Sequence, residues 1–121
     1  MRKAIIGKTF SFDAAHRLPY YEGKCKEMHG HTWKVAIEVK GKVEEDLSSP
    51  TYGMVLDLNK LSSYMNEIKE ELDHKVLNDV LSYPTCENIA YYIKMRFESA
   101  SKLKVERITV QEGEGGYATL Y

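Results

Sequence analysis

The chain has 121 residues, a length that fits one domain and excludes two-domain dehydrogenases, TIM barrels and kinases. With 17 basic and 18 acidic residues it lacks the basic excess typical of nucleic-acid binders. No apolar run is long enough for a membrane helix, and no hydrophobic signal segment follows the first three residues. The two cysteines cannot form a disulfide framework. We therefore expect one cytoplasmic domain over residues 1–121.

Two strands are expected in the first third of the chain. Residues 3–18 read as a strand that places every second side chain on one face. The members of that face are Phe10, Phe12, Ala14 and His16. Residues 31–42 alternate apolar side chains with lysine and glutamate, which is typical of a half-buried antiparallel strand. The residues between these strands form a polar loop.

Two helices follow. Asp57 is placed to cap a helix that extends to about Leu72, and Thr85 to cap a second helix that extends to about Ala100. Apolar residues recur every three or four positions in both. The expected stripes are Leu58, Leu61, Met65, Ile68 and Leu72 in the first helix, and Ile89, Ile93, Phe97 and Ala100 in the second.

The last two strands are expected at residues 105–111 and 117–121, on either side of a glycine-rich turn. The order β-β-α-α-β-β indicates an α+β domain with a four-stranded antiparallel sheet. Two helices can cover only one face of such a sheet and leave its edges open. With nine tyrosines available for contacts between subunits, we expect an oligomer.

Three of the four histidines are expected to meet. His29 and His31 are two residues apart on a strand, so their side chains point to one face. His16 ends the strand that pairs with theirs. Three imidazoles with an open fourth position are typical of a catalytic zinc site. We therefore predict Zn²⁺ bound by His16, His29 and His31.

Other polar side chains could carry chemistry, and each has a structural alternative. Cys25 is a candidate base or nucleophile, a fourth ligand, or an inert thiol. Asp73 can orient His74 for proton transfer only if the backbone turns there, because adjacent helical residues do not face each other. Glu87 suits a helix N-terminus, and Glu112 or Glu87 could instead accept a bidentate pair of N–H donors.

These residues lie in motifs that resemble the 6-pyruvoyltetrahydropterin synthase / 6-carboxytetrahydropterin synthase family. The motifs span nearly the whole chain in family order. They are Phe12-Asp13-Ala14-Ala15-His16-Arg17-Leu18, Cys25-Lys26-Glu27-Met28-His29-Gly30-His31, Gly53-Met54-Val55-Leu56-Asp57, Leu72-Asp73-His74, Pro84-Thr85-Cys86-Glu87-Asn88 and Val110-Gln111-Glu112.

The resemblance implies the tunnelling fold, with trimers that close a twelve-stranded barrel, hexamers built from two trimers, and active sites between subunits. It implies zinc on the three histidines, Cys25 as the catalytic thiol and the Asp73-His74 pair as its assistant. It also implies that Glu112 anchors the pterin ring, with Thr85 and Glu87 nearby. The implied substrate is the small molecule 7,8-dihydroneopterin triphosphate.

The spacing C-x3-H-G-H resembles the branch that forms 6-carboxy-5,6,7,8-tetrahydropterin for 7-deazapurine (queuosine or archaeosine) synthesis, with release of acetaldehyde and triphosphate. 6-Pyruvoyltetrahydropterin synthase is the alternative. Glu27 in the same loop keeps open an aldolase-like cleavage to 6-hydroxymethyl-dihydropterin. A non-catalytic zinc-binding subunit is a further alternative, although it would not need Cys25, the Asp73-His74 pair and Glu112 together.

Overall fold

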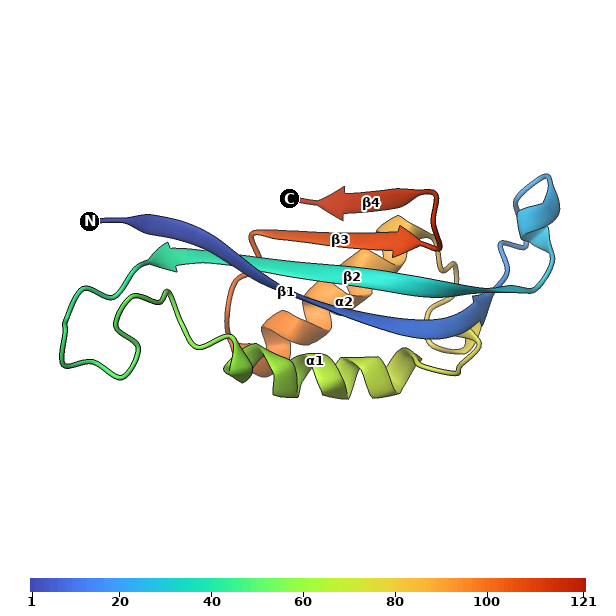
Figure 1. Ribbon diagram of the computed structural model, residues 1–121. Coiled ribbons are helices and arrows are strands. Elements are labelled where there is room, and N and C mark those ends of the chain that lie inside the picture. The colour runs from blue at the N-terminus through green and yellow to red at the C-terminus, as the bar shows by residue number, and fades with distance from the viewer.

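A computed structural model describes residues 1–121, and it confirms the expected order of elements (Figure 1). Four strands form one antiparallel sheet in the order β1-β2-β3-β4. The strands are β1 (Lys3–His16), β2 (His29–Lys42), β3 (Arg107–Glu112) and β4 (Tyr117–Leu120). The helices α1 (Asn59–Leu72) and α2 (Cys86–Ser101) lie together on one side of this sheet. No helix is long and apolar enough to cross a membrane.

Several predicted boundaries were wrong by one or two residues, because hydrogen bonds outside the sheet end the strands. β1 stops at His16 rather than at residue 18, since the next N–H donates to the Asn78 side chain and that of Leu18 to the Cys25 carbonyl. β2 begins at His29 rather than at residue 31. β3 begins at Arg107 rather than at residue 105, and β4 ends at Leu120.

Thr85 caps α2 as predicted, because its Oγ1 accepts the N–H of Asn88 at 3.1 Å. The start of α1 differs slightly. Leu58 occupies the N-cap position, and Asp57 accepts the N–H of Asn59 from one residue further out.

The core lies between the helices and one face of the sheet. β2 contributes the largest buried side chain, Trp33, whose indole N–H donates to the Ala14 carbonyl at 3.1 Å. Both helical stripes are buried as predicted except at their ends, since Leu58 is exposed and Ala100 is only half-buried. The buried members are Leu61, Met65, Ile68 and Leu72 in α1, and Ile89, Ile93 and Phe97 in α2.

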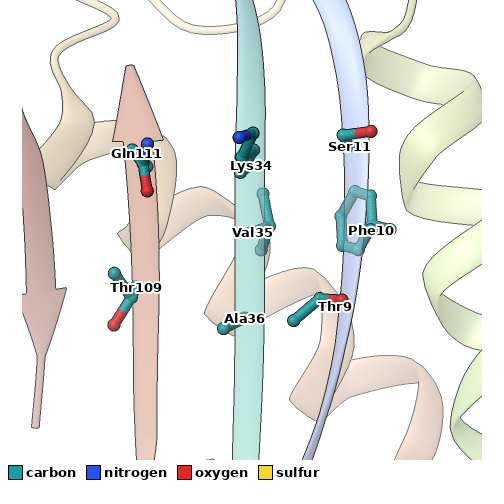
Figure 2. A pocket seen from close by; sticks show the side chains of 8 residues that line it. All are labelled: Thr9, Phe10, Ser11, Lys34, Val35, Ala36, Thr109 and Gln111. Carbon is teal, nitrogen blue, oxygen red and sulfur yellow. The ribbon is translucent and has the colours of Figure 1, made fainter. Parts of the chain in front are cut away.

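The other face of the sheet carries no helix, as the sequence predicted. A hollow of about 520 Å³ lies over β1, β2 and β3 on this side (Figure 2). Polar residues outnumber apolar ones in its lining, among them Ser11, Lys34, Thr109 and Gln111. An uncovered sheet face of this kind can contact water or another subunit.

Candidate active site

The three histidines converge at the end of the β1–β2 hairpin. His16 is the register partner of His29, and His31 lies two residues further along β2. All three side chains point to the face that the helices cover. Their ring centroids are 4.5 to 5.3 Å apart. His16 is 1% exposed. The predicted meeting of these imidazoles is therefore present in the fold.

Backbone carbonyls orient two of these rings. His16 Nδ1 lies 2.8 Å from the Pro84 carbonyl oxygen, and His29 Nδ1 lies 2.7 Å from that of Glu27. A carbonyl oxygen only accepts hydrogen bonds, so each Nδ1 carries the proton. Carbonyl contacts of this kind are typical of metal-ligating histidines, because they fix the tautomer and the ring orientation.

That assignment leaves two lone pairs directed at each other. His16 Nε2 and His29 Nε2 are 3.0 Å apart, and in neutral rings neither has a hydrogen to donate. A proton or a cation is needed between two such nitrogens. Two ligands that each bind one zinc ion at about 2.0–2.1 Å in tetrahedral geometry are about 3.3 Å apart, so the spacing fits a shared metal ion.

His31 and Glu112 complete the group. His31 Nε2 is buried and has no hydrogen-bond partner, which is costly for a polar atom. Glu112 Oε1 lies 3.2 Å from it, and Glu112 Oε2 lies 3.8 Å from His16 Nε2. One potential ligand atom from each of His16, His29, His31 and Glu112 lies within 4.8 Å of the others. The donor set therefore fits a divalent metal that accepts imidazole and carboxylate ligands.

The electrostatics favour a neutral ring at the centre of this group. Burial lowers the pKa of His16 from its ordinary value, and the nearby rings of His29 and His31 act in the same direction. The Pro84 carbonyl and the Glu112 carboxylate oppose that shift. Metal binding requires the neutral imidazole.

Asp73 and His74 do contact each other, because the chain turns after α1 ends at Leu72. His74 has φ of 58°, in the left-handed region, and its Nδ1 lies 3.1 Å from Asp73 Oδ2. The N–H of Asp13 donates to Asp73 Oδ1 at 2.9 Å, and this bond is the main reason that the pKa of Asp73 is lowered. The His74 side chain is 79% exposed and open to a substrate or another subunit.

The structure does not bring Cys25 into either cluster. Cys25 lies in the short 3-10 helix η1 (Lys24–Lys26), where it is half-buried and free of disulfide bonds. It is not among the side chains grouped around His16 or around Asp73. A reaction that uses both Cys25 and His74 therefore requires these two residues to come closer together than they lie within a single chain.

The remaining predicted residues lie near the start of α2. Thr85 is the cap of that helix, and Glu87 is exposed in its first turn. Between them, Cys86 lies close to Glu112. Burial, followed by the charge of Glu112, raises the pKa of Cys86 to about 11, so this thiol stays protonated at neutral pH.

Comparisons with known proteins place the whole chain in one family. The family model described as 6-pyruvoyl tetrahydropterin synthase matches residues 5–121. A 6-carboxy-5,6,7,8-tetrahydropterin synthase from Synechocystis is 40% identical over 111 residues, which is 89% of this chain and 85% of that protein. A dihydroneopterin monophosphate aldolase from Pyrococcus furiosus is 35% identical over 113 residues, which is 92% of this chain and 91% of that protein.

The fold agrees with these matches. The 6-pyruvoyl tetrahydropterin synthase of Caenorhabditis elegans superposes with a TM-score of 0.84 at 27% identity, covering 99% of this chain and 96% of that one. This protein and the Synechocystis relative are both named as tetrahydropterin synthases. The sheet with two helices on one face is therefore the tunnelling fold that the motifs predicted. The chain belongs to the 6-pyruvoyl tetrahydropterin synthase family of tetrahydropterin synthases.

Proposed function

We propose that the chain is a zinc-dependent lyase that converts 7,8-dihydroneopterin triphosphate to 6-carboxy-5,6,7,8-tetrahydropterin, with release of acetaldehyde and triphosphate. The observation that carries the proposal is the convergence of three histidine Nε2 atoms, two of them held by carbonyls at Nδ1. The near full-length similarity to the Synechocystis enzyme supports the carboxy product. That product would serve 7-deazapurine synthesis. The free cysteines fit a cytoplasmic location.

His16, His29 and His31 are the residues that would hold the zinc ion. When bound, the ion would supply Lewis-acid polarisation of a side-chain oxygen. The protein's own contribution is to align the imidazoles and to leave each Nε2 unprotonated. The Pro84 and Glu27 carbonyls do this for His16 and His29 by accepting hydrogen bonds from their Nδ1–H groups, while burial keeps the His16 ring neutral.

Cys25 and the Asp73-His74 pair are the proposed proton carriers. Asp73 holds the Nδ1 side of the His74 ring, which leaves Nε2 free to accept or donate a proton at the substrate's side-chain carbons. Cys25 is the proposed second carrier, in the loop that precedes His29. These proton transfers would accompany departure of the triphosphate.

The separation of these residues within one chain favours a site that is completed by assembly. Cys25 is not grouped with Asp73 and His74, and the His74 side chain is largely exposed. We propose a homohexamer of two trimers in which neighbouring subunits complete each site. The uncovered face of the sheet and the open outer edge of β4 provide surfaces for it. Glu112, with Thr85 and Glu87 nearby, is the proposed binding site of the pterin ring.

A second candidate function comes from the Pyrococcus relative, whose name denotes an aldolase acting on dihydroneopterin monophosphate. Aldol cleavage of the side chain would leave 6-hydroxymethyl-dihydropterin and a two-carbon aldehyde that keeps the phosphate. The Glu27 side chain is exposed in the loop next to Cys25 and could act as the base. 6-Pyruvoyltetrahydropterin synthesis, the activity named for the Caenorhabditis protein, eliminates triphosphate without releasing an aldehyde.

Product analysis tests these alternatives. The zinc-loaded protein is incubated with 7,8-dihydroneopterin triphosphate, the pterin is identified by mass, and aldehydes are assayed in parallel. Carboxytetrahydropterin with acetaldehyde is the expected result. A pyruvoyl product without aldehyde, or a hydroxymethyl product with the phosphorylated aldehyde, would replace the proposal with the corresponding alternative. No product from metal-bound, assembled protein, with either the triphosphate or the monophosphate, would indicate a non-catalytic zinc-binding role.

A further inference from the structure

We infer that Glu112 has two mutually exclusive positions: a fourth ligand of the metal in the substrate-free protein, and, once released, the carboxylate that binds the pterin ring. The second position rests on the function proposed above. The first rests only on the geometry of this chain. The metal ion and the pterin ring therefore compete for one side chain.

The carboxylate is turned toward the histidines with both oxygens. Oε1 lies 3.2 Å from His31 Nε2, and Oε2 lies 3.8 Å from His16 Nε2. A bidentate contact with two parallel N–H donors of a ring edge uses both oxygens on one side of the carboxylate. In the present rotamer both oxygens face the imidazoles, so the side chain rotates to receive the ring.

Charge gives the first position its stability. Three neutral imidazoles leave the full charge of a divalent ion uncompensated, and one carboxylate halves it. The Glu112 carboxylate is also the charged group that lies next to the buried His31 Nε2. In the absence of substrate, the carboxylate is therefore held at the histidines.

The backbone confines the change to the side chain. Glu112 ends β3 as the register partner of Trp33, and its N–H donates to the Gly116 carbonyl at 2.8 Å. The N–H of Gly113 donates to the Thr32 carbonyl at 3.0 Å, which ties the following turn to β2. The Glu112 side chain itself is 29% exposed, so it has room to rotate toward a ligand.

The first test measures metal affinity without substrate. Co²⁺ dissociation constants are determined by chelator competition at one pH for the wild type, Glu112→Gln and Glu114→Gln. Glu114 is an exposed acid in the same turn, and its substitution controls for loss of a nearby negative charge. We expect Glu112→Gln to weaken Co²⁺ binding at least about tenfold, since even residues that only orient ligands contribute about 10–100-fold. We expect Glu114→Gln to leave it unchanged. Equal affinities in all three proteins would overturn the ligand role.

The second test uses the wild type and so does not depend on how the variant folds. The probe is 2-amino-4-oxopteridine, which has the ring edge but no side chain that could reach the metal. Its binding should change the visible absorption of bound Co²⁺, because a carboxylate leaves the ion. Binding with an unchanged cobalt spectrum would overturn the exchange. If the probe does not bind, the role of Glu112 in binding the pterin ring is overturned, together with the proposed substrate class. The chelator competition still decides whether Glu112 is a metal ligand.

Discussion

The N–H of His74 donates to the Asp13 carbonyl at 2.6 Å, which attaches the predicted proton-transfer pair to the outer edge of β1. Two residues along that edge, the N–H of Ala15 donates to the Lys75 carbonyl. The segment after α1 thus pairs with the strand that carries His16. Strand β1 therefore holds the pair at its outer edge and one proposed metal ligand, His16, on its helix-covered face.

Asp73→Asn should lower kcat while leaving metal content unchanged. The side-chain oxygen of Asn can still accept the N–H of Asp13. Asn cannot, however, place a negative charge beside the His74 ring. We expect a loss of about a hundredfold, the lower range for a positioned acid–base group. Asp79→Asn, an exposed acid in the 3-10 helix η2 (Leu77–Asp79), is the matched control and should keep wild-type kcat.

The same substitution should alter the pH dependence of stability in the metal-free protein. The pKa of Asp73 is lowered in the fold below its ordinary value of 3.8, so its charged form favours folding above about pH 4. That contribution is lost as the pH falls through the lowered pKa. Urea unfolding between pH 6 and pH 3 should show a shallower decline for Asp73→Asn than for the wild type. Parallel curves would show that the Asp13 contact does not depend on the charge.

Cys25→Ala should abolish turnover and leave zinc occupancy close to that of the wild type. The three histidines and Glu112 remain grouped without this thiol. Zinc is measured by elemental analysis of the purified protein. Loss of metal in this variant would identify Cys25 as a ligand instead of a proton carrier.

His29→Ala should sharply lower zinc occupancy. It removes one of the two nitrogens that lie 3.0 Å apart and leaves the Glu27 carbonyl without its imidazole donor. His74→Ala is the control, because His74 contacts Asp73 and lies outside the histidine group. Full occupancy in His29→Ala would exclude the three-histidine site.

The single tryptophan should report metal binding directly. Trp33 is buried, with its ring centroid 4.8 Å from that of His16 and 5.4 Å from that of His31, both edge-on. A quenching ion such as Co²⁺ held by these rings should reduce its fluorescence in a saturable titration. The signal should be weak or absent in His29→Ala. Equal quenching in both proteins would mean that the ion binds elsewhere.

The two cysteines should differ in alkylation at pH 8. Cys86 is half-buried, and its pKa of about 11 keeps it protonated, so iodoacetamide should modify it slowly. Cys25 lies in the η1 loop and should react first, as followed by peptide mass. Above about pH 9, the Cys86 thiol ionises in the unfolded chain but not in the fold, so the free energy of unfolding of the wild type should fall. It should fall less in Cys86→Ala.

Much of this fold follows from local pattern. Alternation along β1 and β2, the helical stripes and the Thr85 cap are short-range features that a sequence carries directly. The spacing of His29 and His31 likewise determines that both side chains share a face. The strand ends were predicted less well, because they depend on bonds to distant partners such as Asn78.

The sequence by itself determined the element order, the three-histidine group and the family. Only the tertiary structure decided where the Glu112 carboxylate lies and whether the Asp73-His74 pair can form. Glu112 reaches the histidines because β3 pairs with β2 at Trp33, a register between residues nearly eighty positions apart that no local pattern encodes. Asp73 and His74 face each other because the chain leaves α1 in a left-handed turn held by β1. Both relationships depend on long-range backbone hydrogen bonds, whose partners are chosen when the sheet assembles.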